Sequence, residues 1–259
     1  MLLMVILLIN TKGCLLIRRF RGLNNMSRPN LNQIIKEEHS HIDSVLHNSG
    51  RLRNFIDNKT GYFIYKRTLD IVISFALTVL VLSWLIPIIS LAIFISSGAP
   101  IFFRQKRIGL VGKSFYCYKF RTMVINEDSD KIQARENDAR ITAIGKFLRK
   151  TNLDELPQIL NVLNGSMSLV GPRPHMYSDC NHFASVIPGY KFRNLVKPGI
   201  TGMAQIKGYH GPTSDFESIF RRYQWDAFYI RNLSIWTDLR IIRQTVIQSL
   251  KSLLRLCVS

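Results

Sequence analysis

The feature that most constrains this chain is a long stretch without a charged residue, from Ile71 to Phe103, interrupted by Pro87. Residues 69–97 are apolar enough for a bilayer, and as one straight helix they would be about 43 Å long. The hydrocarbon core of a membrane is only about 30 Å thick. A proline inside a helix removes one backbone hydrogen bond and clashes with the carbonyl four residues earlier. The stretch therefore predicts a membrane helix that is broken at Pro87.

Basic residues flank this segment on both sides, which bears on how it enters the membrane. Lys66 and Arg67 precede it, and Arg104, Lys106 and Arg107 follow it. Because basic flanks favour the cytoplasmic side, two such flanks indicate a bent, re-entrant helical hairpin that dips into one leaflet. An ordinary transmembrane helix with a proline kink is the alternative that the residues alone leave open.

The chain as a whole is strongly basic. Among 259 residues, Lys and Arg number 35 and Asp and Glu 17, which gives a net charge of +18. Such a charge indicates anionic partners, such as acidic lipid, phosphorylated small molecules or nucleic acid. The hydrophobic fraction of 47% favours a membrane-surface protein over a nucleic-acid binder. The four cysteines form no CxxC pair, so neither a zinc site nor a disulfide framework is expected.

Outside the apolar stretch, three regions carry weaker signals. Residues 1–60 are mixed and polar after a short apolar start, and we interpret them as a weakly structured leader. Ile101–Phe103 and Ser114–Phe120 predict two short strands of a hairpin around a glycine-containing turn. The run from Asp238 to Leu256 predicts an amphipathic basic helix lying on anionic lipid, or alternatively a helix packed on the core.

An adjacent acid pair, Asp154 and Glu155, stands near the start of a run whose apolar residues recur at helical spacing from about Asn152. Acids in a first helical turn commonly cap free amides and complement the helix dipole, which is the structural alternative. Carboxylates amid so much positive charge are, however, expected to have low pKa values. An ionised aspartate can attack phosphorus or hold Mg²⁺, and arginine forks suit phosphate oxygens. The basic residues close in sequence are Arg140, Arg149, Lys150 and Arg173.

Several ordered motifs lead to a family. They closely resemble the bacterial sugar transferases, the monotopic polyprenyl-phosphate glycosyl-1-phosphate transferases, over about Tyr65 to Val246. The segment Gly202–Thr213 resembles the branch that starts exopolysaccharides with glucose 1-phosphate, although His210 stands where arginine is usual. The motifs are, in chain order, Lys119-Phe-Arg-Thr-Met123, Asp138-Ala-Arg-Ile-Thr142, Leu153-Asp-Glu-Leu-Pro-Gln158, Met167-Ser-Leu-Val-Gly-Pro-Arg-Pro174 and Lys197-Pro-Gly-Ile-Thr-Gly202.

The resemblance implies an α+β, mostly helical, monotopic membrane protein with a re-entrant helix broken at Pro87, a small β-hairpin and amphipathic surface helices. With the leader set apart, residues 61–100 would form the membrane helix. Residues 101–259 would form a cytosolic catalytic domain that ends in amphipathic helices. The active site would then lie on the cytoplasmic face of the inner membrane.

The resemblance also implies a phosphoglycosyl transferase with a UDP-sugar donor, an undecaprenyl phosphate acceptor and Mg²⁺. Asp154 would be the nucleophile and Glu155 its metal-binding or acid–base partner, and both would be metal ligands. The phosphate-binding residues would be Arg121, Arg149, Arg173 and Arg140. Its partners would include anionic phospholipid and no nucleic acid. The alternative function is a non-catalytic, membrane-tethered basic protein that binds acidic lipid or nucleic acid.

Overall fold

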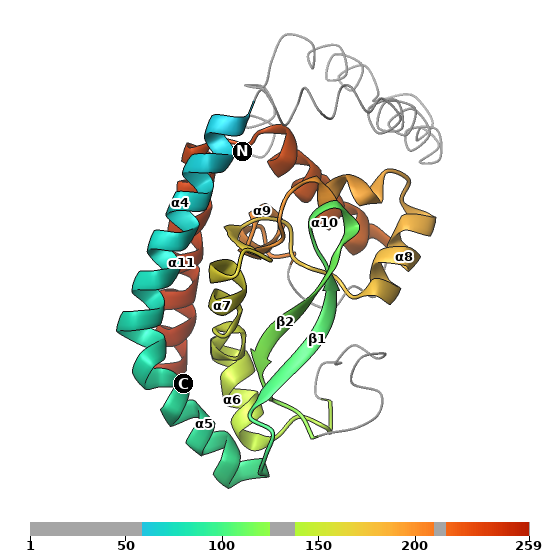
Figure 1. The fold of residues 1–259 in the computed structure, drawn as a ribbon. Coiled ribbons are helices and arrows are strands. Elements are labelled where there is room, and N and C mark those ends of the chain that lie inside the picture. The colour runs from blue at the N-terminus through green and yellow to red at the C-terminus, as the bar shows by residue number, and fades with distance from the viewer. Residues whose placement is uncertain (1–58, 125–137, 210–215, 259) are drawn as a thin grey trace. The chain divides into compact units, whose positions relative to one another are not determined.

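The computed structural model describes residues 59–124, 138–209 and 216–258, without the side chains of residue 253 and residues 255–258. Nearly all of the expected leader, and His210, therefore lie outside the described residues. The described part is mostly helical, with a small antiparallel hairpin and a second two-stranded sheet (Figure 1). This agrees with the predicted fold class and is consistent with a monotopic membrane protein.

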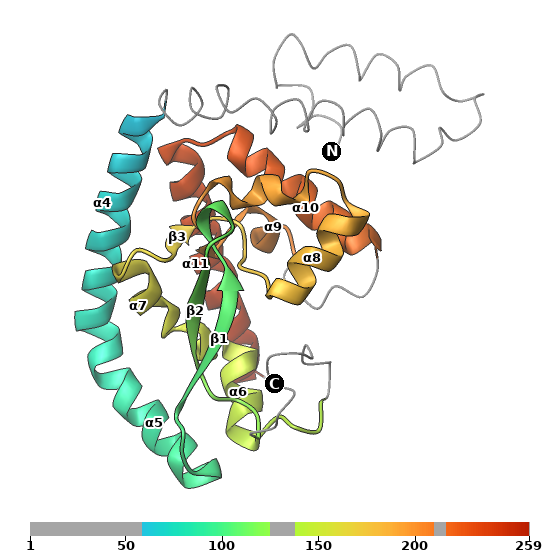
Figure 2. The same cartoon turned by 45° about the vertical axis from the view of Figure 1, so that its right-hand side comes forward.

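The uncharged stretch forms a long, bent helical rod. It consists of α4 (Thr60–Leu77), a π-helical turn η2 (Thr78–Leu82) and α5 (Ser83–Ser97), here called the apolar rod. At 38 residues it is long and apolar enough to cross a membrane, judged by length and composition. The bend is open, which means that α5 continues away from α4 and does not pack back against it (Figures 1 and 2).

The distortion of the rod lies before Pro87 rather than at it. The Ser83 N–H reaches back to the Thr78 carbonyl, which is the wider π-helical bond, and α5 then continues through the proline. The Ser83 hydroxyl donates to the Val79 carbonyl at 2.6 Å. Because the proline ring presses on the carbonyl of Ser83, the adjustment falls on the turn that ends there.

The two faces of the apolar rod differ along its whole length. The inner face is buried against the rest of the described chain at Asp70, Ser74, Leu82, Ile89 and Ile93. The Asp70 carboxylate accepts the backbone N–H of Leu169 at 3.0 Å. The outer face carries exposed apolar side chains: Ile64, Tyr65, Ile71, Val72, Phe75, Val79, Leu80, Trp84, Ile88, Leu91, Phe94 and Ile95.

The predicted hairpin is confirmed. Strand β1 (Phe102–Ile108) pairs antiparallel with β2 (Ser114–Phe120) across the 3-10 turn η3 (Leu110–Gly112). The first strand is longer than the Ile101–Phe103 segment that the sequence predicted. Its central residues alternate as in a strand, since Gln105 is buried between the exposed Arg104 and Lys106.

A short parallel sheet and several helices complete the described part. Strand β3 (Ser168–Val170) pairs with β4 (Gly199–Thr201), where Gly171 and Gly199 approach too closely for a Cβ on either. The helical elements are α6 (Ala143–Thr151), η4 (Leu153–Glu155), α7 (Gln158–Leu163), α8 (Tyr177–Val186), η5 (Tyr190–Leu195), α9 (Met203–Ile206), α10 (Phe216–Arg231) and α11 (Ile235–Val258).

Helix α11 packs on the core, as one of the two predicted alternatives has it, while contact with anionic lipid stays a prediction. Its Ile241 is fully buried, and Asp238 is buried between Lys66 and Tyr62 of α4. On another side it exposes apolar residues, so the helix packs on the core and is amphipathic as well. The exposed apolar residues are Trp236, Leu239, Val246, Leu250 and Leu254.

Candidate active site

The acid pair lies in a tight 3-10 turn between two helices. Helix α6 ends because Asn152 adopts the left-handed conformation, with φ 57°. Pro157 then stands immediately before α7, where a missing N–H costs nothing. The prediction of a helix starting near Asn152 is therefore wrong, since α7 begins at Gln158. Asp154 and Glu155 belong to the turn η4.

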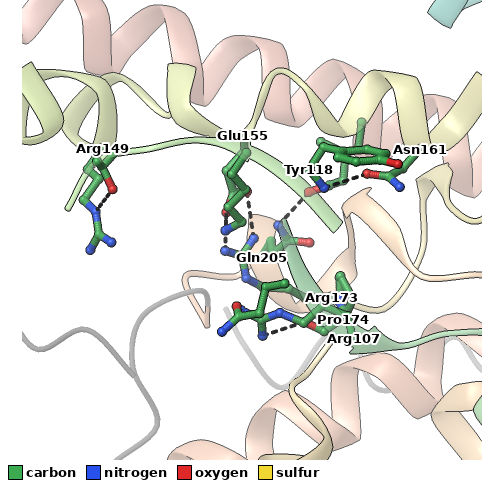
Figure 3. Close-up of polar contacts among 12 residues, drawn as sticks. Arg107, Tyr118, Arg149, Glu155, Asn161, Arg173, Pro174 and Gln205 are labelled. Carbon is green, nitrogen blue, oxygen red and sulfur yellow. Dashed lines mark hydrogen bonds and ion pairs between the residues drawn. The ribbon is translucent and has the colours of Figure 1, made fainter. Parts of the chain in front are cut away.

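A single buried amide fastens α7 to the hairpin. The Asn161 side chain donates to the Tyr116 carbonyl at 2.7 Å and accepts the Tyr118 N–H at 2.9 Å (Figure 3). Both contacts are with the backbone of β2. Lys119 is the next residue of that strand, so this fastening brings it beside the turn that holds Glu155.

Glu155 is held by two cations. Lys119 Nζ lies 2.6 Å from Oε1, and the Arg173 guanidinium bridges both carboxylate oxygens at 2.9 and 2.5 Å (Figure 3). Burial opposes ionisation of this carboxyl, but the charges of Arg173 and Lys119 outweigh it. The pKa of Glu155 therefore lies well below its ordinary value, and the group is an anion at neutral pH.

Asp154 has a different environment from its neighbour. Its side chain is buried, and among the residues that the structure describes it forms no hydrogen bond or ion pair. Burial raises its pKa, and the negative charge of Glu155 adds to the rise while Lys119 opposes it. The expectation of a low pKa thus holds for Glu155 and is wrong for Asp154, because burial outweighs charges that do not touch it. Asp154 is therefore a poorly solvated carboxyl group without a bound partner among the described residues.

The four predicted arginines have different partners. Arg173 joins the acid pair directly, as described above. Arg149 Nε donates to the Thr122 hydroxyl at 2.8 Å, and its charge acts on Asp154 without contact. Arg140 forms a bidentate pair with Asp138, at 2.9 and 2.6 Å. The phosphate-binding roles of Arg149 and Arg140 stay predictions.

Arg121 holds the end of the apolar rod. Its buried guanidinium donates to the carbonyls of Ser97, Gly98 and Ala99 at 2.8, 2.6 and 3.0 Å. The Ser97 carbonyl is one of those that a helix leaves unpaired at its C-terminus, and Gly98 and Ala99 follow directly after the helix. Two of its nitrogens are therefore occupied by the end of α5, which accounts for Arg121 structurally. The phosphate-binding role predicted for Arg121 stays a prediction.

Lys119 contacts the acid pair, although the sequence showed it only as the first residue of a motif and assigned it no role. The signal was available in the predicted hairpin, since side chains alternate across a strand. Lys119 shares its face with the buried Cys117, so a lysine there points inward and requires an acidic partner. That partner is Glu155.

The donor set suits Mg²⁺. Two adjacent carboxylates, Asp154 and Glu155, supply the oxygen ligands that this ion prefers, and Mg²⁺ is commonly held by one or two carboxylates plus substrate phosphates. Within residues 59–124, 138–209 and 216–258, no third acidic, histidine or cysteine side chain joins them. The remaining ligands would then come from substrate and water.

This fold and site define a class. The family model described as bacterial sugar transferase matches residues 61–252, and the chain belongs to that family. The match covers the apolar rod, the hairpin and the acid pair.

Particular relatives make the comparison more specific. The chain is 49% identical over 184 residues to the UDP-glucose:undecaprenyl-phosphate glucose-1-phosphate transferase of Klebsiella pneumoniae, covering 71% of this chain and 39% of the relative. A protein of the same name from Caulobacter vibrioides is 44% identical, with 70% and 68% covered. The exopolysaccharide production protein PSS of Rhizobium leguminosarum bv. phaseoli is 41% identical, with 72% and 96% covered. The chain spans about two fifths of the length of the first of these.

Proposed function

We propose that this chain transfers a sugar 1-phosphate from a UDP-sugar to undecaprenyl phosphate, in two steps through a covalent intermediate. Glucose is the sugar favoured by the names of the relatives with 44–49% identity. The product, undecaprenyl diphosphate-sugar, would start an exopolysaccharide, a capsule or an O-antigen.

In the first step Asp154 attacks the sugar-bearing phosphorus of the donor. An oxygen–phosphorus bond forms to the carboxylate, the bond to the bridging oxygen of the diphosphate breaks, and UMP leaves. Because Asp154 is buried and unpartnered, little solvation has to be removed before attack. Arg173, whose fork suits phosphate oxygens, would stabilise the charge on the transferring group.

In the second step an oxygen of undecaprenyl phosphate attacks the aspartyl-phosphosugar and restores the Asp154 carboxylate. Glu155 serves as a charged partner and not as a proton donor, since its pKa lies well below its ordinary value. Bound by Asp154 and Glu155, Mg²⁺ would neutralise phosphate charge. Arg149 and Arg140 are proposed as further phosphate contacts. Arg121 is proposed as a phosphate contact as well, beside its hydrogen bonds to the end of the rod.

One observation carries the proposal: a free, buried carboxylate lies next to one that two cations hold ionised. Acidic residues that only cap a helix would not need one unpartnered carboxyl group beside one that two cations bind. The test uses the detergent-solubilised protein and UDP-glucose without acceptor. UMP release and a mass increase of one phosphosugar on the protein are expected, and Asp154→Asn should show neither. UMP formation without a covalent adduct in rapid-quench samples would contradict the two-step mechanism.

The same assay tests the alternative function. A non-catalytic, membrane-tethered protein that binds acidic lipid or nucleic acid would release no UMP from any UDP-sugar, with or without undecaprenyl phosphate and Mg²⁺. A panel of UDP-sugars should also identify the sugar.

We further propose that the apolar rod re-enters the membrane, which puts the active site on the cytoplasmic face of the inner membrane, against anionic phospholipid. The support is that both ends of the rod contact the same unit. At one end Arg67 donates to the Val162 and Leu163 carbonyls at 2.6 and 2.9 Å. At the other end the rod is held by Arg121.

Cysteine labelling tests this topology. In a background without the four native cysteines, Gly61→Cys and Lys113→Cys mark the two flanks, and a Cβ at Gly61 meets no neighbour. Neither site should react with an impermeant thiol reagent in intact cells, and both should react once the inner membrane is opened. Pro87→Ala should let the rod straighten and expose one flank in some molecules. Labelling of either flank in intact cells, with Pro87 present, would establish a spanning helix.

A further inference from the structure

The segment that carries Arg173 is held largely through its carbonyls, because two of its three residues are prolines. Pro172 and Pro174 have no backbone N–H, so hydrogen bonds to this segment must be accepted and not donated at both positions. Each of its three carbonyls has a donor from another part of the fold. The donors are the Gly199 N–H to Pro172 at 3.0 Å, Arg193 Nη2 to Arg173 at 2.7 Å and Arg107 Nη1 to Pro174 at 3.4 Å.

The donor to Arg173 is itself fixed from behind. Arg193 is 3% exposed and lies in η5. Its Nε and Nη2 donate to Asp226 Oδ2 of α10 at 3.1 and 2.7 Å, and its Nη1 donates to the Tyr190 hydroxyl at 3.3 Å. All three nitrogens of the guanidinium therefore have partners, and one of these partners is the backbone of the arginine that grips Glu155.

A buried ion pair of this kind is a costly way to stabilise a fold, because desolvation offsets most of the attraction. Two hydrophobic side chains of the same size would pack equally well in its place. What a hydrophobic pair cannot supply is a donor to the Arg173 carbonyl. The geometry thus gives the pair a purpose that packing alone does not.

We propose that Arg193, held in place by Asp226, is a positioning residue for the proposed reaction: it fixes the backbone of Arg173 and so the place of the guanidinium that meets the donor diphosphate. The inference rests on the proposed role of Arg173 in phosphate binding. Arg193 does not touch substrate. It acts through one carbonyl, and misplacement of a binding group by about 1 Å can cost on the order of 100-fold in rate.

The variants separate positioning from folding. Arg193→Met combined with Asp226→Leu removes the bond to Arg173 and both members of the ion pair together, so the protein is expected to fold. The buried Arg222, whose charge also acts on Asp226, is unchanged in every variant of the test. Arg193→Lys keeps a cation opposite Asp226, but one ammonium cannot reproduce the planar fork that joins Asp226, Tyr190 and the carbonyl. Tyr223→Phe is the control, because Tyr223 also ties α10 to the start of η5, through the Gly189 carbonyl at 3.0 Å.

The decisive measurement is a double-mutant cycle on kcat/KM for UDP-glucose. The Met/Leu pair should lower kcat/KM on the order of 10- to 100-fold in the Arg173 protein, and less than about 3-fold when Arg173→Lys is already present. Arg193→Lys should rescue little, and Tyr223→Phe should match the wild type. Thermal unfolding checks that each variant is folded. An equal loss in both backgrounds, or full activity of the folded pair variant, would overturn the proposal.

A calorimetric measurement of UDP-glucose binding distinguishes failure of the Arg193 proposal from failure of the proposed reaction. A wild type that binds UDP-glucose but transfers nothing would contradict the proposed reaction alone. In that case the same cycle, measured on the dissociation constant, still judges Arg193.

Discussion

Two acid–arginine pairs lie one behind the other, and they are joined by the Arg173 carbonyl. The outer pair, Glu155 with Arg173, is partly open to solvent, with side-chain exposures of 15% and 26%. The inner pair, Asp226 with Arg193, is 2% and 3% exposed. In the outer pair the cations overcome burial and lower the pKa of Glu155. In the inner pair burial raises the pKa of Asp226 more than Arg193 lowers it.

The difference indicates two purposes for one kind of contact. The outer pair is partly open to solvent, so in the proposed reaction Arg173 would exchange the carboxylate for a phosphate. The inner pair has no access for a ligand and contributes little net stability, yet it fixes the backbone on which that exchange depends. Four substitutions and one titration test this contrast. They are taken in order of their expected effect on the free energy of unfolding.

Asp226→Asn should have the largest effect. It leaves the Arg193 charge buried without a counter-ion, which typically costs about 3–5 kcal/mol. Denaturant unfolding in detergent measures the loss. The Arg193→Met, Asp226→Leu double variant is the control and should recover most of the stability. An Asp226→Asn protein as stable as the wild type would show that Arg193 does not need Asp226 as its counter-ion.

Glu155→Gln should cost less, about 1–3 kcal/mol, because Lys119 and Arg173 keep partial access to water. Turnover should nevertheless fall severely, since the anion that organises both cations is lost. UMP release and unfolding measured on one preparation separate the two effects. Retained turnover would remove Glu155 from the site.

The difference in stability between wild type and Glu155→Gln should depend on pH, in the direction set by the lowered pKa of Glu155. Since the pKa of Glu155 is lowered by folding, its stabilising contribution is fully present above its ordinary value of about 4.5. The contribution is lost as the pH falls below that value toward the folded-state pKa. The stability gap between wild type and Glu155→Gln should therefore be largest near neutral pH and shrink below about pH 4.5. A gap that widens on acidification would reverse the assigned direction.

Arg173→Lys should change the free energy of unfolding by less than about 1 kcal/mol, because the charge opposite Glu155 is kept. Its turnover should fall on the order of 100-fold, since lysine lacks the planar fork. Steady-state kinetics with UDP-glucose measure this. Full activity would reduce Arg173 to a general source of positive charge.

Asp154→Asn should have the smallest effect on stability, and its sign should be opposite. Folding raises the pKa of Asp154, so the ionised form is disfavoured and a neutral amide should stabilise by less than about 1 kcal/mol. Turnover should vanish all the same. A clear loss of stability would show that Asp154 serves the fold.

The sequence predicted the elements whose signal is local. The apolar rod, the hairpin and the acid pair all follow from residues adjacent in the chain. Patterns of this kind do not reveal contacts between distant positions, and the errors are of that type. Lys119 meets Glu155 across 36 positions and Arg193 meets Asp226 across 33. The start of α7 was missed for a local reason, since the left-handed conformation of Asn152 has only a weak sequence signal.

Arg121 has a consequence that reaches beyond its hydrogen bonds. It clamps the end of the apolar rod, and Lys119, two residues earlier on the same chain, grips Glu155. Two residues of extended chain span only about 7 Å. If the rod lies in a membrane as proposed, a change in bilayer thickness or curvature that tilts it would act on the acid pair through this short link. The catalytic rate should vary with the acyl-chain length of the surrounding lipid, which would make the bilayer itself an effector of the reaction.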